Sequence, residues 1–246
     1  MLNVLRIALL LPVLLLTGNA DAAAPPPDFK ASYELTRGSM KIGNSSIELS
    51  TGRNGSYTYR SRSWPVRWVA WFLKDKLDET SRGRITAQGI RPDRYHYQRT
   101  GGTTEREARL AFHWNDLTVE NDVAESRWKM NIPAGTLDKL ASQLGMMMAL
   151  ADGKTDISFD VADGGKLKQY RYRVVGADTI QVPAGTFRTV KVVRVRDSSQ
   201  RETYIWCAPA LHFLPVRIWQ REKDDAEYQS DLEHFSSALA TPGVGQ

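Results

Sequence analysis

The strongest strand pattern of the chain lies in residues 176–218, which read GADTIQVPAGTFRTVKVVRVRDSSQRETYIWCAPALHFLPVRI. Side chains of a β-strand point alternately to its two faces, so residues of one kind at every second position mark one face. Over residues 188–196, valines stand on both faces, with charged residues between them and at the ends. This pattern predicts a central strand that is covered on both sides.

Turns divide this stretch into antiparallel strands. The segment PAG, residues 183–185, predicts a tight turn, because proline fixes φ and glycine accepts a positive φ two residues later. The polar run DSSQ, residues 197–200, is the second predicted turn. Alternation resumes in residues 203–207 and 216–219, so two further strands follow.

The same stretch resembles the DUF3108 family of exported bacterial proteins, to which no activity is assigned. The likeness is carried by VPAGTFRTVKV (182–192), by the Trp-containing segment YIW (204–206) and by LPVRI (214–218), and it extends over about residues 29–235. Members of the family commonly have an acidic crossing before the LPV segment. This chain has CAPALH there, at residues 207–212, so a role for an acidic crossing does not carry over.

In fold, that family is more loosely similar to the half-barrel carriers and chaperones of the bacterial envelope. The resemblance implies an open, strongly curved sheet whose hollow side handles apolar cargo. Because one fold hosts many functions, it implies the architecture more firmly than the activity.

The first 22 residues have the organisation of a signal peptide. Arg6 precedes an apolar run over residues 7–16, and Ala20-Asp21-Ala22 is a cleavage site of the A-x-A type. The alternative, a membrane anchor, requires about 20 apolar residues, and this run is shorter. No cysteine lies near the cleavage site, so we expect a soluble periplasmic protein without a lipid anchor.

The remaining chain divides into a Pro-rich linker (23–28), a single β-rich DUF3108-like domain (29–237) and a flexible tail (238–246). The net charge of +5 and the pI near 9.3 suit contact with anionic surfaces, although simple solubility explains them equally well. Export excludes nucleic acid as the expected partner. The single cysteine, Cys207, excludes an intramolecular disulfide.

The segment SWPVRWVAWFLKDKL, residues 63–77, is the least ordinary part of the chain. It predicts a short helix with Ser63 as its cap and Pro65 in its first turn. The spacing i, i+4, i+7, i+8 places four aromatic residues on one face of that helix: Trp64, Trp68, Trp71 and Phe72. Such a helix is a core plug of an open half-barrel, a lid over a ligand or a membrane-docking loop.

Residues 136–150 predict a second helix, with Thr136 as its N-cap and an apolar stripe of leucines. Its end carries Met146, Met147 and Met148, whose flexible side chains adapt to irregular surfaces and to variable ligands. The helix therefore packs over the concave face of the sheet, forms a cavity wall, or does both.

The sequence contains no catalytic motif and no metal-ligand spacing among its four histidines and one cysteine. We therefore expect no enzyme activity, no cofactor and no metal. Arg171 and Arg173 belong to arginine-rich strands that suit an anionic head group, since guanidinium groups recognise phosphate and carboxylate well. The alternative is cross-strand pairing with Asp and Glu.

The sequence thus predicts a mainly β protein: a curved antiparallel sheet, an open or half β-barrel, with one amphipathic helix and a short aromatic helical segment covering the concave face. The expected function is non-enzymatic binding or carriage of an amphiphilic envelope component, such as a lipid, a lipopolysaccharide precursor or an acyl chain. The expected ligand-binding residues are Trp64, Trp68, Trp71, Phe72, Met146, Met147, Met148, Arg171 and Arg173. Two alternatives remain: an assembly factor that binds an envelope protein partner, and a glycan-binding or glycan-active protein.

Overall fold

A computed structural model describes residues 25–71, 74–124, 126–196 and 201–238. The predicted signal peptide (1–22) and the predicted turn at residues 197–200 lie outside the described residues. Within the described ranges, no helix is long and apolar enough to cross a membrane.

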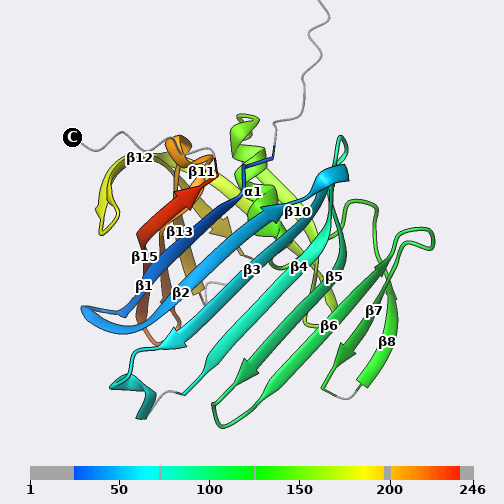
Figure 1. The fold of residues 1–246 in the computed structure, drawn as a ribbon, viewed down its shortest axis with the longest axis horizontal. Helices are drawn as coiled ribbons and strands as arrows, with labels where there is room; N and C mark the ends of the chain where they lie inside the picture. Colours follow the sequence, from blue (N-terminus) through cyan, green and yellow to red (C-terminus); the bar gives the residue numbers. More distant parts are fainter. Residues whose placement is uncertain (1–24, 72–73, 125, 197–200, 239–246) are drawn as a thin grey trace, which may run out of the picture.

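The described chain forms one fifteen-stranded sheet and one α-helix, α1 (Ala141–Ala151) (Figure 1). The strands are β1 (Phe29–Arg37), β2 (Met40–Thr51), β3 (Ser56–Pro65), β4 (Lys76–Thr86), β5 (Gly89–Thr100), β6 (Arg106–His113), β7 (Thr118–Val123), β8 (Ser126–Asn131), β9 (Leu137–Asp138), β10 (Asp156–Asp163), β11 (Lys166–Val182), β12 (Gly185–Val195), β13 (Arg201–Ala208), β14 (Leu214–Glu222) and β15 (Glu227–Ser237).

The sheet consists of two meanders, β1 to β8 and β9 to β15, which are joined by the pairing of β1 with β15. From one edge to the other the order is β8-β7-β6-β5-β4-β3-β2-β1-β15-β14-β13-β12-β11-β10-β9. Neighbouring strands are antiparallel except β9 and β10. The edge strands β8 and β9 do not pair with each other in the described sheet, so it stays an open barrel. This arrangement confirms the predicted fold class.

The sheet curls around α1, which fills its hollow side (Figure 1). Leu144 of α1 is fully buried, as are Leu49 and Leu110 on the surrounding strands. A helix enclosed in this way must be apolar nearly all round. Accordingly, eight of its eleven residues are buried, and the polar face of an ordinary amphipathic helix is missing.

The helix begins later than the sequence predicts. Leu137 and Asp138 form β9 beside β10, and Leu140 is the N-cap position. Thr136 is therefore not the cap: its hydroxyl donates to the carbonyl of Pro133 (2.8 Å). The side chain of Asp138 instead accepts hydrogen bonds from the first backbone N–H groups of the helix. The prediction of a helix from residue 136 is wrong, because pairing with β10 holds these residues extended.

The aromatic segment at residues 63–77 is also not one helix. Strand β3 continues through Pro65, which pairs with Gly43 of β2, and only Val69–Trp71 forms a short 3-10 helix, η2. Pairing of β3 with β4 ends at Ser63, so Pro65 lies where β3 has a neighbour on one side only, and proline is tolerated in such an edge position. Sheet pairing therefore overrides the helical spacing of the tryptophans.

The turn predicted at residues 183–185 is confirmed. Strands β11 and β12 pair in a register that sets Val182 opposite Gly185. Gly185 has φ of 132°, within the region that favours glycine. This hairpin therefore follows from local sequence.

Candidate functional site

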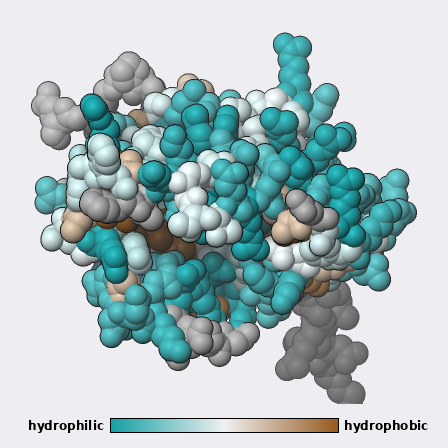
Figure 2. All heavy atoms as spheres, turned by 90° about the horizontal axis from the view of Figure 1, so that it is seen from below, coloured by the Kyte–Doolittle hydropathy of each residue, from teal (hydrophilic) through white to brown (hydrophobic). Residues whose placement is uncertain are grey.

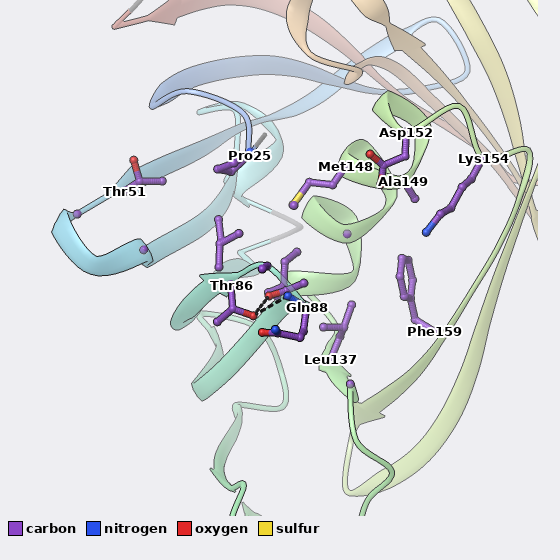
Figure 3. Close-up of a pocket in the computed structure, with 18 residues that line it drawn as sticks. Pro25, Thr51, Thr86, Gln88, Leu137, Met148, Ala149, Asp152, Lys154 and Phe159 are labelled. Atoms are coloured by element: carbon purple, nitrogen blue, oxygen red, sulfur yellow. Dashed lines mark hydrogen bonds between the residues drawn. The ribbon is translucent and has the colours of Figure 1, made fainter. Parts of the chain in front are cut away.

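A cavity of about 690 Å³ opens at the end of the barrel where α1 meets the β2–β3 and β4–β5 turns, which we call the upper end (Figures 1 and 3). Its walls come from segments far apart in the chain. The apolar part of the lining consists of Ile85, Ile90, Leu137, Met148, Ala149 and Phe159. Polar side chains, including Thr51, Thr86, Gln88, Asp152 and Lys154, line it as well. The cavity thus combines apolar and polar lining.

Close packing behind the cavity fixes the position of α1. A Cβ atom at Gly145 would lie 3.0 Å from Cζ of Phe159 and 3.1 Å from Cδ1 of Leu137. These contacts are tight, so any larger residue at position 145 would require the side chains of Phe159 and Leu137 to shift. Met148 lies beside it and points into the cavity (Figure 3).

The opposite wall is the β4–β5 turn, which has its own hydrogen bonds. The Thr86 hydroxyl donates to the carbonyl of Gly89 (3.1 Å) and accepts from the backbone N–H of Gln88 (3.2 Å). These bonds hold the backbone of the turn in one conformation. Thr86 and Gln88 therefore form a preorganised polar edge across from α1 (Figure 3).

A buried polar network ties the start of α1 to the sheet. Asp138 accepts hydrogen bonds from the backbone N–H groups of Leu140 (2.9 Å) and Ala141 (2.7 Å). Its other oxygen accepts from the Ser81 hydroxyl (2.5 Å), which also bonds the Tyr57 hydroxyl (2.8 Å). The network therefore spans β3, β4, β9 and α1.

A second set of contacts continues this network along β4. Glu79 accepts from the Tyr95 hydroxyl (2.8 Å) and pairs with Lys139 (2.8 Å). The Lys139 ammonium lies 5.4 Å from the centre of the Tyr97 ring. Lys139 thus anchors the chain between β9 and α1 to the wall formed by β4 and β5.

Burial gives this network unusual proton affinities. It raises the pKa of Asp138 to about 7, although the hydrogen bonds from Ala141, Ser81 and Leu140 act in the opposite direction. Burial also raises the pKa of Tyr57 and of Tyr95, so both phenols keep their protons. Asp138 is therefore the group of this network that changes charge near neutral pH.

The structure separates the predicted ligand-binding residues. Met148 lines the cavity, whereas Met146 and Met147 are each only 1% exposed and belong to the core. The tryptophans lie at the other end of β3 from the cavity. Trp64, the first of them, is nine residues along the chain from Gly55 of the cavity wall. At the rise of a strand, this separation is about 30 Å. Phe72 lies outside the described residues.

The two predicted arginines also lie away from the cavity lining. Arg173 of β11 pairs with Asp156 of β10, with Nε 2.8 Å from Oδ1, and the two residues are opposite each other in the strand register. Arg171 has a partner too. For Arg173, these contacts match cross-strand pairing.

An outer-face row of aromatic residues has its own partners. The Tyr204 ring lies 6.2 Å from Trp206 and 5.9 Å from Trp219. The Lys191 ammonium lies 4.9 Å from the centre of the Tyr204 ring and 5.0 Å from that of Trp206, and Trp206 donates to Asp178. Cation–π contacts within the sheet therefore account for the arrangement of these rings.

The thiol of Cys207 is fully buried, and burial raises its pKa. We expect the folded protein to show no reaction with a thiol-specific disulfide reagent, since only the thiolate attacks. Full reaction should appear on unfolding. A Ser39→Cys variant, in an exposed turn, should gain one thiol that reacts in the folded state. Reaction of Cys207 in the folded wild type would contradict this.

Sequence reasoning missed Asp138 and most of the cavity lining. One local signal existed, because an aspartate shortly before an apolar run marks a helix start. In the described ranges, no group of three or more His, Cys, Asp or Glu side chains is placed to hold a metal ion.

Comparison with known proteins assigns this open barrel to a protein family. The family model for DUF3108, a protein family of unknown function, matches residues 32–232. The chain therefore belongs to the DUF3108 family. No curated protein matches it.

Solved structures share the architecture at low sequence identity. A β-barrel-like protein from Brucella abortus, with the domain of unknown function DUF1849, is 9% identical, with a TM-score of 0.58 over 88% of this chain and 100% of that one. A candidate lipoprotein from Parabacteroides distasonis is 11% identical, with a TM-score of 0.36 over 85% and 95%. A candidate exported protein with a YmcC-like fold, from Bacteroides fragilis, is 11% identical, with a TM-score of 0.35 over 87% and 99%. The first of these likenesses supports the fold alone.

Proposed function

We propose that this protein binds an amphiphilic molecule of the bacterial envelope without chemical turnover, and that the apolar part of the molecule enters the cavity at the upper end. The observation that carries the proposal is the cavity of about 690 Å³ beside Met148. Binding sites for small molecules commonly measure about 300–1,000 Å³ and combine apolar walls with a few polar groups. The predicted signal peptide supports the compartment.

The lining suits a flexible chain with a polar head. Ile85, Leu137 and Phe159 offer apolar surface, and Met148 adapts its shape to what it contacts. Lys154 contributes a cation to the same lining. An anionic head group near Lys154, with its acyl chain beside Met148, satisfies both kinds of lining.

A fluorescent fatty acid, labelled with a dansyl group, tests this proposal by titration. Met148→Trp should weaken probe binding at least about tenfold, because excluding two methylene groups from the cavity costs about 1.6 kcal/mol. Met40→Trp is the matched control: Met40 is exposed and begins β2, whose other end, Thr51, lines the cavity, so binding should not change.

The proposal fails if wild-type protein does not bind the probe, or if the two variants bind it equally well. Native mass spectrometry on protein purified from a bacterial periplasm adds a second measurement. A clean apo mass, with no added mass after incubation with envelope lipids, would favour the alternative of a protein partner.

A further inference from the structure

Three tryptophans are exposed at the lower end of the molecule, opposite the cavity. Trp71 is 82% exposed, Trp68 is 55% exposed and Trp64 is 41% exposed. Trp64 lies at the end of β3, Trp68 in the turn that follows and Trp71 in η2, at the lower left of Figure 1. Such a concentration of bare indole rings marks an interaction surface.

The backbone holds these rings outward. Val69, between the two most exposed tryptophans, is buried and anchors η2 in the protein. The backbone N–H of Val66 donates to the carbonyl of Ile42 on β2 (3.1 Å), and that of Ala70 donates to the carbonyl of Val66 (3.0 Å). The exposed tryptophans are therefore carried by a hydrogen-bonded turn.

The surroundings of the tryptophans are basic. Four exposed cations form no ion pair within the described part of the chain: Arg62, Arg67, Lys74 and Lys76. Arg62, Trp64 and Lys76 line one shallow groove. The two carboxylates next in sequence are engaged elsewhere, Asp75 by Arg99 (2.7 Å) and Asp78 by Arg60 (3.1 Å). Residues 62–78, which carry the tryptophans, therefore have a net positive charge of their own.

Figure 2 views the molecule from this lower side. Hydrophilic residues dominate the face, and the most hydrophobic ones gather in a hollow rather than on the protruding parts. Aliphatic insertion deep into hydrocarbon therefore does not suit this end. Tryptophan beside Lys and Arg is the composition of protein segments that rest at the level of lipid head groups.

We propose that the lower end docks on an anionic phospholipid bilayer through Trp64, Trp68 and Trp71, with the four cations contacting lipid phosphates. Indole rings occupy the interface between head groups and acyl chains, and cations near an anionic leaflet add attraction. Docking in this orientation leaves the cavity, about 30 Å away along β3, open to solvent. The inference rests on the tryptophans and charges, independently of the proposed ligand.

Flotation with vesicles of phosphatidylglycerol and phosphatidylcholine in equal parts tests the proposal on the chain without residues 1–22. Wild-type protein should float with these vesicles, remain unbound with pure phosphatidylcholine, and be released by high salt. Trp68→Ser combined with Trp71→Ser should bind at least about tenfold more weakly, as should Arg67→Glu combined with Lys76→Glu.

The matched control is Arg53→Glu combined with Arg84→Glu, which reverses two exposed arginines away from this end and changes the net charge equally. Its binding should stay at the wild-type level. If both charge-reversal variants bind the vesicles equally weakly, net charge alone explains the binding, and the proposed docking site is wrong. Failure of the wild type to float would also overturn it. Met148→Trp should float like wild type, so this result and the probe titration are independent.

Discussion

Replacing Asp138 by alanine should lower the free energy of unfolding by about 3 kcal/mol at pH 6, the loss expected when buried hydrogen-bond donors are left unpaired. The carboxyl group of Asp138 accepts from the backbone N–H groups of Leu140 and Ala141 and from the Ser81 hydroxyl. The methyl side chain of alanine cannot accept a hydrogen bond from any of these three donors. Urea unfolding at pH 6, followed by far-ultraviolet circular dichroism, measures the loss.

The same carboxyl makes stability depend on pH. Its folded-state pKa of about 7 lies above the ordinary value of 3.8, because burial disfavours the charged form. Between these values the folded protein keeps a proton that the unfolded chain has lost. The contribution of Asp138 is therefore fully present below about pH 4, and falls by on the order of 4 kcal/mol as the pH rises to about 7.

Asp138→Asn separates the charge from the hydrogen bonds. Its amide oxygen still accepts from Leu140 and Ala141, and its amide nitrogen donates to Ser81, whose own proton turns toward Tyr57. Relative to wild type, this variant should gain stability steadily from about pH 4 to about pH 7, and then level off. A relative loss over that window would contradict the raised pKa.

The strands and hairpins could be read from the sequence because their signals are local. The valines of β12 alternate within a few residues, and the turn at residues 183–185 carries its own backbone preferences. The start of α1 could not be read in this way. Asp138 lies 57 residues from Ser81 in the chain, so only the folded sheet brings the two together.

The aromatic segment shows how two local signals compete. The spacing of Trp64, Trp68 and Trp71 matches a helix, but the same residues tolerate a strand end followed by a short turn. The pairing of Pro65 with Gly43 decides between them, and it depends on a neighbouring strand. The cavity is hidden for a similar reason, since Ile85, Leu137 and Phe159 meet only in the curled sheet.

At Gly83 the backbone of β5 leaves no room for a side chain, and Gly83→Ala is the second change with a large expected effect. An added Cβ would meet the carbonyl oxygen of Arg91 and would lie 2.7 Å from Cα of Pro92. Both are backbone atoms, so a strand must move rather than a side chain. We expect a loss of about 3 kcal/mol, the upper range of overpacking in a well-packed interior.

The register explains why this position controls the cavity. Arg82 pairs with Arg94 but Gly83 pairs with Pro92, so Asp93 is an extra residue on β5. A bulge of this kind bends the strand and increases its twist. Just beyond it, Ile85 pairs with Ile90 at the cavity wall. Displacing the bulge therefore moves the wall, and Gly83→Ala should also weaken binding of the dansyl fatty acid.

Gly38→Ala provides the comparison for this prediction. Gly38 has φ of 56° with no atom within 4 Å of an added Cβ, so its replacement carries only the strain of a left-handed backbone, about 1 kcal/mol. Urea unfolding of both variants separates crowding from backbone strain. If both variants lose the same free energy of unfolding, then β4 and β5 accommodate the added methyl group at Gly83 without an energetic penalty from crowding. The bulge would then not fix the position of the cavity wall.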